Sequence, residues 1–171
     1  GYINNHPKKI EIARKIIEAR SNSKIITFSN NIKMAESIKM GGQVYTGKDT
    51  KKKARANLDE FNNSKTGLIN SVSKLNEGAD IKGLSVAIIL GLDSSEIKAV
   101  QRRGRCIRFE EGKTAEIFNL VIDQTVECEW FRKGHPNGDY ITIDEDGLND
   151  VLAGKEPKPY VKKIKNFQFR Y

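Results

Sequence analysis

The chain has 171 residues, 37% of them hydrophobic, and a formal net charge of +8. This length and hydrophobic content suit one medium-sized domain with a small appendage. Two cysteines are too few for a disulfide-rich secreted scaffold, no apolar run approaches the ~20 residues of a membrane span, and no signal-peptide pattern opens the chain. We therefore expect a cytoplasmic protein (host cytoplasm if viral) and, because the chain begins with Gly1 rather than Met, a piece of a longer one.

The first two-thirds of the chain alternates helical and strand patterns. Apolar residues at helical spacing predict a helix over 7–20, and a short apolar run predicts a buried strand over 25–28. The further expected elements are, in order, a helix over 31–40, a strand over 44–46, a helix over 50–62, a strand over 67–72, a loop or helical turn, a strand over 86–90, a helix near 95–107 and a strand over 115–121. This alternation predicts an α/β fold in which helices cover both faces of a parallel sheet.

A second pattern begins after Ile122. Its expected elements are a hairpin that turns at Asn137-Gly138 between Trp130-Phe131 and Tyr140–Ile143, a short helix over 148–152 and a lysine-rich tail over 155–171. The sequence therefore predicts a core domain over 1–122 and a C-terminal appendage over 123–171.

The basic excess lies in the first part of the chain. Residues 1–66 carry 14 Lys and Arg against 6 Asp and Glu, whereas residues 67–122 carry 8 against 7 and residues 123–171 carry 8 against 9. This asymmetry indicates contact with a polyanion. A lysine-rich surface that only maintains solubility would give the same asymmetry.

Small polar residues or glycines lie at the ends of four of the predicted strands, at Ser29-Asn30, Thr46-Gly47, Asn70-Ser71 and Gly91. In a parallel sheet these carboxyl ends share one edge, where ligands gather and where the backbone can approach a phosphate. A single loop of this kind carries little weight because caps and turns use the same residues. Four of them on one edge favour a phosphate ligand.

Four arginines lie within seven positions of the segment Gln101–Arg108, at positions 102, 103, 105 and 108. The planar guanidinium suits phosphate, and arginines beside a transferred phosphoryl group stabilise its developing charge. A solvated basic helix or a nucleic-acid patch would look similar. Upstream, in the loop Ser71–Asp80, Gly78 permits a tight turn and Asp80 could accept a hydrogen bond from a ribose hydroxyl, although Glu77 and Asp80 could equally cap backbone amides.

Taken in order, these segments resemble the second RecA-like domain of superfamily 2 helicases and translocases, over roughly residues 8–122. Motif IV of that family resembles I-I-T-F-S-N-N, and the stretch after motif IV resembles V-Y-T-G-K-D with Arg55 and Phe61. Motif V resembles S-V-S-K-L-N-E-G-A-D-I, and motif VI resembles Q-R-R-G-R-C-I-R. The L-N-E-G and Q-first forms favour DNA-directed members, including phage and restriction-type translocases.

The resemblance implies a role for each matching residue. Arg105 and Arg108 would be catalytic arginine fingers that reach the γ-phosphate of ATP on a partner domain. Gln101 would lie at the same interface, and Gly78 and Asp80 would approach the nucleotide. The nucleic-acid backbone would be contacted by Ser29, Asn30, Gly47, Ser71, Ser73 and Arg55, with Ser71 or Ser73 standing where many relatives have Thr.

Other candidate motifs fail. Gly112-Lys113-Thr114 lacks the first glycine of a Walker A loop, and no carboxylate motif for Mg²⁺ is present. The Thr142–Ala153 stretch lacks the first and last ligands of an EF-hand, and the histidines and cysteines show no zinc spacing. ATP and Mg²⁺ would therefore be bound mainly by an N-terminal RecA-like domain, and this chain alone should be inactive.

The sequence therefore predicts the C-terminal motor domain of an ATP-dependent DNA helicase or translocase, with DNA favoured over RNA and no membrane contact. Two alternatives stay open. One is a non-enzymatic nucleic-acid-binding module with the same fold, and the other is a module that docks a partner protein through residues 123–171.

Overall fold

The computed structural model describes residues 6–45, 51–72, 81–91, 107–109, 115–123, 125–138 and 140–160. Contacts divide the chain into two compact units, Gly1–Pro136 and Asn137–Tyr171. The division predicted from the sequence, at residue 122, would have put the segment around Glu127 in the second unit. In the described part of the chain, no helix has the length and apolar character needed to cross a membrane.

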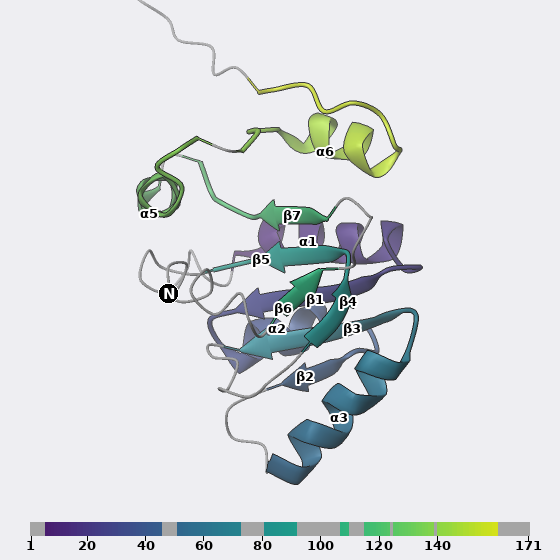
Figure 1. Ribbon diagram of the computed structural model, residues 1–171. Coiled ribbons are helices and arrows are strands. Elements are labelled where there is room, and N and C mark those ends of the chain that lie inside the picture. The colour runs from purple at the N-terminus through teal and green to yellow at the C-terminus, as the bar shows by residue number, and fades with distance from the viewer. Residues whose placement is uncertain are drawn as a thin grey trace, which may run out of the picture. The chain divides into compact units, whose positions relative to one another are not determined.

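The first unit is built on a five-stranded sheet whose order is β2-β3-β1-β5-β7 (Figure 1). Its strands are β1 (Lys24–Ser29), β2 (Gln43–Tyr45), β3 (Gly67–Val72), β5 (Val86–Ile89) and β7 (Glu116–Asn119). Every neighbouring pair in this sheet is parallel. The predicted α/β class with a parallel sheet is confirmed, and the expected strands lie within two residues of the observed ones.

Alternate residues of β1 face opposite sides of the sheet. Ile26 and Phe28 belong to a buried cluster with Leu58 and Phe61 of α3 (Lys51–Asn63). On the opposite side, α1 (Pro7–Ala19) and α2 (Ile32–Ile38) cover the sheet, and α2 contacts both β1 and β3. Figure 1 shows α1 and α2 behind the sheet and α3 on its other side.

Local signals explain where these helices begin. The Nδ1 atom of His6 accepts a hydrogen bond from the backbone N–H of Lys8 (3.1 Å), and Pro7 occupies the first helical position of α1. A proline is tolerated there because that N–H has no partner within the helix. The side chain of Asn31 accepts a hydrogen bond from the N–H of Met34 (2.9 Å) and caps α2 in the same way.

Two short strands were missed by the sequence analysis. β4 (Ile81–Leu84) and β6 (Ile107–Phe109) form a parallel two-stranded sheet that packs on the α3 side of the main sheet, with Ile81 and Leu84 in the same buried cluster. A loop or helical turn was expected where β4 lies, and the helix expected near 95–107 lies outside the described residues except for Ile107, which begins β6. Strands of three or four residues carry too little periodicity to be recognised, and their pairing is long-range.

The predicted hairpin around Asn137-Gly138 is wrong. Residues Val126–Gly134 form a helix, α5, and residues 140–143 form no strand. The Thr125 hydroxyl caps α5 by accepting a hydrogen bond from the N–H of Glu127, two glutamates lie in the first turn, and an arginine and a lysine lie in the last. These charges complement the helix dipole and favour a helix over the strand suggested by Trp130-Phe131.

The second unit contains one described helix, α6 (Glu145–Leu152). The Asp144 carboxylate accepts a hydrogen bond from the N–H of Gly147 (2.9 Å), and Leu148 is buried. The chain then returns so that the N–H of Tyr160 donates to the carbonyl of Thr142 (2.5 Å). The short helix expected over 148–152 is therefore present, with three more residues at its start.

Lys24 holds the first residue of β1 to α3 and β4. Its Nζ donates to the carbonyl oxygens of Asn62 (3.3 Å) and Lys82 (3.0 Å) and lies 4.7 Å from the centre of the Phe61 ring. The residue is 6% exposed. A buried ammonium bound in this way stabilises the junction of three elements.

We expect Lys24→Met to lower the free energy of unfolding by about 2–3 kcal/mol, because two charge-assisted hydrogen bonds and a cation–π contact are lost. Urea-induced unfolding of the chain, followed by circular dichroism, measures this change. Lys39→Met is the matched control, since the Lys39 side chain is 51% exposed in a surface ion pair with Glu36. A control effect within about 0.5 kcal/mol is expected, and equal losses in both variants would contradict the assignment.

Candidate functional site

The carboxyl ends of four strands lie in register at one edge of the sheet. Phe28 of β1 is paired with both Ser71 and Ile89, and Ile89 is paired in turn with Asn119. Ser29 is the last residue of β1 and lies opposite Val72. This arrangement confirms that the chain leaves the sheet at a common edge after β1, β3, β5 and β7.

Buried polar side chains underlie this edge. The Thr27 hydroxyl donates to Oδ1 of Asn70 (2.7 Å), and both residues are fully buried. Hydroxyl and amide groups are costly to bury without such a partner. The pair therefore fixes β1 and β3 relative to each other two residues before their ends.

Ser29 and Ser71 lie near the edge but on opposite faces of the sheet, because Ser71 is paired with Phe28, the residue before Ser29. Both residues are buried as a whole, backbone included, with exposed fractions of 0% and 1%. The Ser29 hydroxyl has no hydrogen-bond partner within the described part of the chain. Of the three predicted residues described at this edge, Asn30 is the one that is partly exposed.

A buried ion pair lies at the same edge. The Nζ of Lys9, from α1, binds Oε1 of Glu127 in α5 and donates to the carbonyl of Leu90 (2.6 Å). The second carboxylate oxygen of Glu127 accepts a hydrogen bond from the N–H of Ile122 (2.9 Å). Side-chain exposure is 3% for Lys9 and 7% for Glu127. The pair joins α1, the end of β5 and the turn after β7.

The electrostatics of Lys9 reflect its burial. Desolvation lowers the pKa of Lys9 below its ordinary value, and the hydrogen bond and charge of Glu127 only partly oppose this effect. At the opposite, amino edge, Arg20 binds Glu116 through two hydrogen bonds of 2.7 and 3.1 Å. The hydrogen bond to Glu116 raises the pKa of Arg20, whose side chain is 19% exposed.

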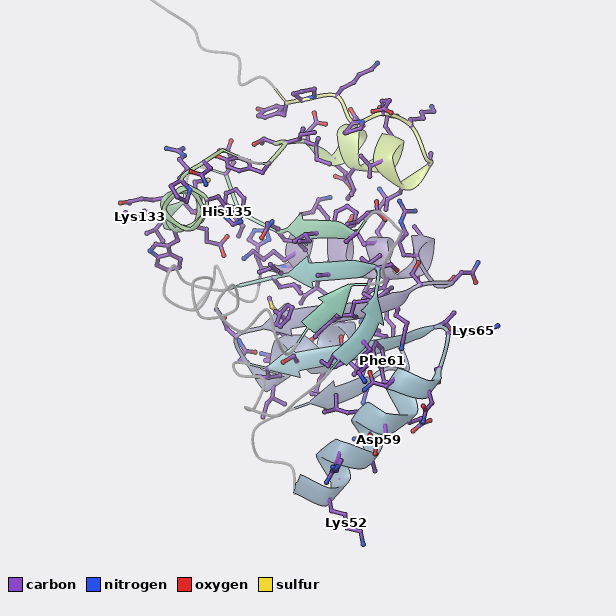
Figure 2. The ribbon with its side chains drawn as sticks, viewed as in Figure 1. Lys52, Asp59, Phe61, Lys65, Lys133 and His135 are labelled. Carbon is purple, nitrogen blue, oxygen red and sulfur yellow. The ribbon has the colours of Figure 1, made fainter. Side chains whose placement is uncertain are left out.

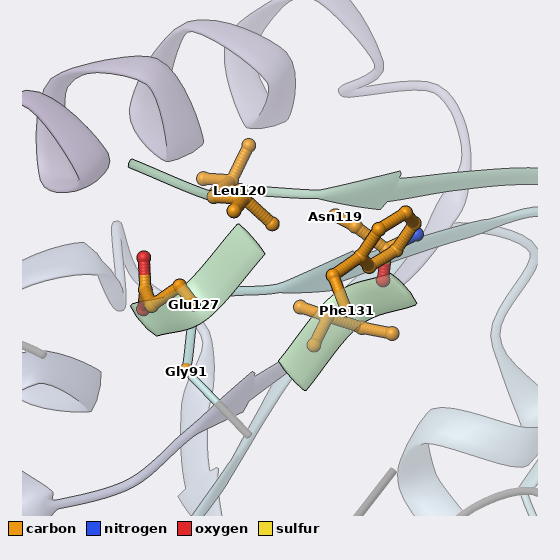
Figure 3. A pocket seen from close by; sticks show the side chains of 7 residues that line it. Gly91, Asn119, Leu120, Glu127 and Phe131 are labelled. Carbon is orange, nitrogen blue, oxygen red and sulfur yellow. The ribbon is translucent and has the colours of Figure 1, made fainter. Parts of the chain in front are cut away.

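A small pocket lies beside the Glu127 carboxylate (Figure 3). It is lined by residues of β5, β7, α5 and the turns between them: Ile89, Gly91, Asn119, Leu120, Val121, Glu127 and Phe131. Oδ1 of Asn119 is buried and has no hydrogen-bond partner among the residues that the structure describes. The pocket encloses about 270 Å³, a volume that includes open solvent at its mouth. It suits a water molecule better than a nucleotide.

The β4–β6 pair brings two sequence motifs together. Ile81, the residue directly after Asp80, is the Cα partner of Ile107, the residue directly before Arg108. The loop Ser71–Asp80 and the arginine segment Gln101–Arg108 therefore end at adjacent backbone positions. Two residues that are 26 positions apart in sequence, Ile81 and Ile107, are thus paired in the same small sheet.

The first turn of α3 is strongly basic. Lys51, Lys52 and Lys53 occupy it, and it contains no acidic residue. Arg55 follows and is exposed. Figure 2 shows Lys52 extending away from the sheet, whereas Phe61, near the other end of α3, points toward it. Lysines at the positive end of a helix dipole create a local preference for an anion.

The structure describes part of the predicted site. It places Ser29, Asn30 and Ser71 at the carboxyl edge, Arg55 on α3 and the backbone of Arg108 in β6. The other predicted residues lie outside the described part: Gly47, Ser73, Gly78, Asp80, Gln101 and Arg105. Sequence reasoning missed Lys9 and Glu127, because a lysine near the start of an amphipathic helix carries no local signal of burial.

Comparisons with known proteins agree with this geometry. The helicase conserved C-terminal domain family matches residues 8–110. A DNA 3'-5' translocase, XPB2 of Sulfurisphaera tokodaii, is 28% identical over 131 residues, which are 75% of this chain and 30% of that protein. The chain thus spans less than a third of the length of this relative.

Solved structures share the fold. The helicase domain of Hef from Pyrococcus furiosus is 26% identical, with a TM-score of 0.54, over 74% of this chain and 28% of that one. The C-terminal domain of the DEAD-box protein Dbp5 is 17% identical, with a TM-score of 0.68, over 88% of this chain and 93% of that one. The predicted RecA-like fold is confirmed, and the chain belongs to the helicase conserved C-terminal domain family of superfamily 2.

Proposed function

We propose that the chain is the C-terminal motor domain of an ATP-dependent, DNA-directed helicase or translocase. It would complete an ATPase site on an N-terminal RecA-like domain and hold part of the nucleic-acid backbone. Each cycle of domain closure and opening would then shift the grip along the strand. The family match supports the domain assignment, and the relative XPB2, a DNA translocase, supports DNA over RNA. A phage or restriction-type origin stays a prediction.

The observation that carries the proposal is the pairing of Ile81 with Ile107. It supports a common site for the loop Ser71–Asp80 and the segment Gln101–Arg108, which resemble motifs V and VI. Nucleotide contacts by the first and phosphate contacts by the second require this proximity. Neither segment alone would distinguish a motor from a basic surface patch.

On the nucleotide side, Arg105 and Arg108 would act as arginine fingers. When water attacks the γ-phosphorus and the bond to the bridging oxygen breaks, ADP departs with the electron pair. Guanidinium groups would stabilise the negative charge on the bridging oxygen and on the oxygens of the transferred phosphoryl group. Gln101 would lie at the same interface. Gly78 would let the backbone approach the nucleotide, and the Asp80 carboxylate would accept a hydrogen bond from a ribose hydroxyl.

Mg²⁺ would be bound by ATP and by the N-terminal domain. In the described residues, no group of three or more His, Cys, Asp or Glu side chains could hold a metal ion. We therefore assign no metal ligand to this part of the chain. The proposed contribution of this domain is positive charge, which it would supply only when the two domains close.

On the nucleic-acid side, Ser29, Asn30, Gly47 and Ser71 or Ser73 would contact the sugar-phosphate backbone from the carboxyl edge. Among the residues of this set that the structure describes, Asn30 is partly exposed, which supports a contact from that position. The basic first turn of α3 and the exposed Arg55 supply positive charge nearby in sequence. Contacts of this kind do not read bases, so binding should be largely independent of sequence.

The test is nucleic-acid-stimulated ATP turnover by the complete gene product. We expect hydrolysis that depends on added DNA. If the protein binds DNA fully but hydrolyses no ATP under any condition, the motor function is contradicted and the non-enzymatic binding module is supported. Loss of a protein partner on removal of residues 137–171, which leaves the Lys9–Glu127 pair in place, with DNA binding intact, would instead support the docking module.

We expect Arg55→Ala to weaken DNA binding and to reduce the slope of log K against log salt by about 0.9, because one phosphate contact is lost. Fluorescence anisotropy of a labelled duplex over a range of salt concentrations measures both quantities. Lys133→Ala is the control, since the Lys133 side chain is 61% exposed on α5 and pairs with Glu129. An unchanged slope for Arg55→Ala would show that Arg55 makes no contact with a DNA phosphate.

A further inference from the structure

A fully buried hydrogen bond joins β1 and β3, which lie side by side in the main sheet (Figure 1). The Thr27 hydroxyl donates to Oδ1 of Asn70 (2.7 Å), and both residues are 0% exposed. The two residues are Cα partners in the parallel pairing of these strands. Because Ile26 and Phe28 face α3, the pair lies on the opposite side of the sheet, which α1 and α2 cover.

Apolar residues flank the pair in its row across the sheet. Asn70 is paired on its other side with Val44 of β2, and Thr27 is paired on its other side with Ile88 of β5. Ile88 is paired in turn with Phe118 of β7. In this row of one residue from each strand, Thr27 and Asn70 are the polar members, and they are neighbours.

The apolar residues of β1 and β3 specify this register only weakly. All six residues of β1 are buried, and so are the last four of β3. In a strand with one buried face, a shift of one residue exposes every apolar side chain and is therefore strongly disfavoured. In a strand with two buried faces, a shifted register still buries the apolar side chains. Burial of apolar surface therefore leaves the choice of register to other contacts.

The buried polar pair makes the shifted registers costly. A shift of one residue would turn Asn70 to the other face of the sheet, into the apolar cluster beneath α3. A shift of two residues would place Leu68 or Val72 opposite Thr27, and neither side chain can accept a hydrogen bond from its hydroxyl. Buried amide and hydroxyl groups without a partner are unfavourable, so the pair selects the observed register.

The register decides where the carboxyl edge of the sheet lies. It aligns Ser29 at the end of β1 with Val72 at the end of β3, and the residue after Ser29 is the partly exposed Asn30. The structure describes the whole backbone from Thr27 to Asn30. A shift of two residues would move the end of β1 relative to β3 by about 7 Å, since a strand rises about 3.3 Å per residue. Hydrogen bonds to a phosphate require distances of about 3 Å, so a contact made from both strands would be lost.

We infer that Asn70 is a positioning residue, which sets the register of β3 against β1 through its hydrogen bond with Thr27 and so holds Asn30 at the level required for contact with the nucleic-acid backbone. This inference rests on the proposed function. Neither member of the pair touches nucleic acid, because both are fully buried. Their replacement should therefore weaken DNA binding by moving the edge and not by removing a contact.

The test replaces the pair by apolar residues of similar shape, Thr27→Val with Asn70→Leu, in the complete gene product. Because this double variant leaves neither member of the pair without its partner, the urea midpoint of unfolding should stay close to the wild-type value. Selective ¹⁵N-isoleucine labelling reports on Ile25, Ile26 and Ile69 in the two strands. We expect a second set of their amide resonances, from about half of the molecules or more in a shifted register. Kd for DNA should rise by the inverse of the fraction that keeps the native register, about twofold to tenfold.

Ile88→Val is the matched control, because Ile88 is fully buried in the same row of the sheet and carries no polar group. It should lower the urea midpoint slightly and leave one set of resonances and the wild-type DNA affinity. Thr27→Ser, which keeps the hydroxyl, should also retain one register and the wild-type affinity. If the double variant does not fold, Thr27→Val alone removes the hydroxyl with little change of shape. It should show the second register in a smaller fraction of the molecules.

A single native register in the double variant would overturn the positioning role, whatever its DNA affinity. A second register with an unchanged Kd would overturn the link between register and DNA binding. Equal losses of affinity in the double variant and in Ile88→Val would also overturn this link, because both would then reflect general destabilisation. If the wild type binds no DNA, the link fails together with the proposed function, whereas the resonances still decide whether the pair sets the register.

Discussion

Arg105→Ala in the complete gene product is expected to lower DNA-stimulated ATP turnover by about 10³-fold or more, with DNA affinity largely unchanged. Removal of an arginine finger withdraws the charge that stabilises the γ-phosphate in the transition state, and effects on the order of 10³ to 10⁵ are typical. Ground-state binding depends mainly on the partner domain, so KM for ATP should change little. Steady-state phosphate release with saturating DNA measures kcat, and anisotropy measures DNA binding.

The control for this variant is Arg132→Ala, which removes an exposed arginine from the last turn of α5. It should hydrolyse ATP at the wild-type rate. Arg108→Ala should behave like Arg105→Ala, and the double variant should lose little more than either alone, because fingers that serve one transition state act as a unit. If Arg105→Ala hydrolyses ATP at the wild-type rate, the arginine segment has no catalytic role and at most binds phosphate groups.

Much of the fold could be predicted because its signals are local. The helix α1 is specified by apolar residues at Ala13, Ile16 and Ile17, which are all buried, and by Pro7 at its start. The strand β1 contains the apolar residues Ile25, Ile26 and Phe28 and is buried along its whole length. Parallel pairing then follows, since helices separate the strands.

Two parts of the fold could not be predicted, one because its pairing is distant in sequence and one because its local signals conflict. Ile81–Leu84 becomes a strand only because Ile107 pairs with it, and neither segment is long enough to show a period. Trp130 and Phe131 suggested a strand, but the Thr125 cap and the charges at the two ends of α5 favour a helix. In each case a short apolar run was compatible with more than one secondary structure. The pairing with Ile107 made the first a strand, and the cap and end charges made the second a helix.

The same reasoning explains the uneven prediction of the site. The strand ends at Ser29 and Ser71 were found because the edge of a parallel sheet can be inferred from chain order. Lys9 was not found, because nothing near it in sequence distinguishes it from an exposed lysine. Its partner Glu127 lies 118 residues away. Only the folded arrangement identifies the pair as part of the edge.

Single replacement of Lys9 by Met is expected to lower the free energy of unfolding of the chain by about 3–5 kcal/mol, because it leaves the Glu127 carboxylate buried without its counter-charge. Glu127→Leu should cost a similar amount for the same reason. The double apolar variant should recover part of the loss, since no uncompensated charge remains, although the Leu90 carbonyl and the Ile122 N–H lose their buried partners. Urea-induced unfolding gives the three values, and their non-additivity gives the coupling between the two residues.

The Arg20–Glu116 pair provides the comparison for this cycle. Its side chains are 19% and 30% exposed, so water can solvate whichever charge remains after a single replacement. Arg20→Leu should therefore cost less than Lys9→Met, about 1–2 kcal/mol, with weak coupling to Glu116. Additive effects of Lys9→Met and Glu127→Leu, with no recovery in the double variant, would mean that the two side chains stabilise the fold separately. In that case the buried pair would not act as a single anchor between α1, β5 and α5.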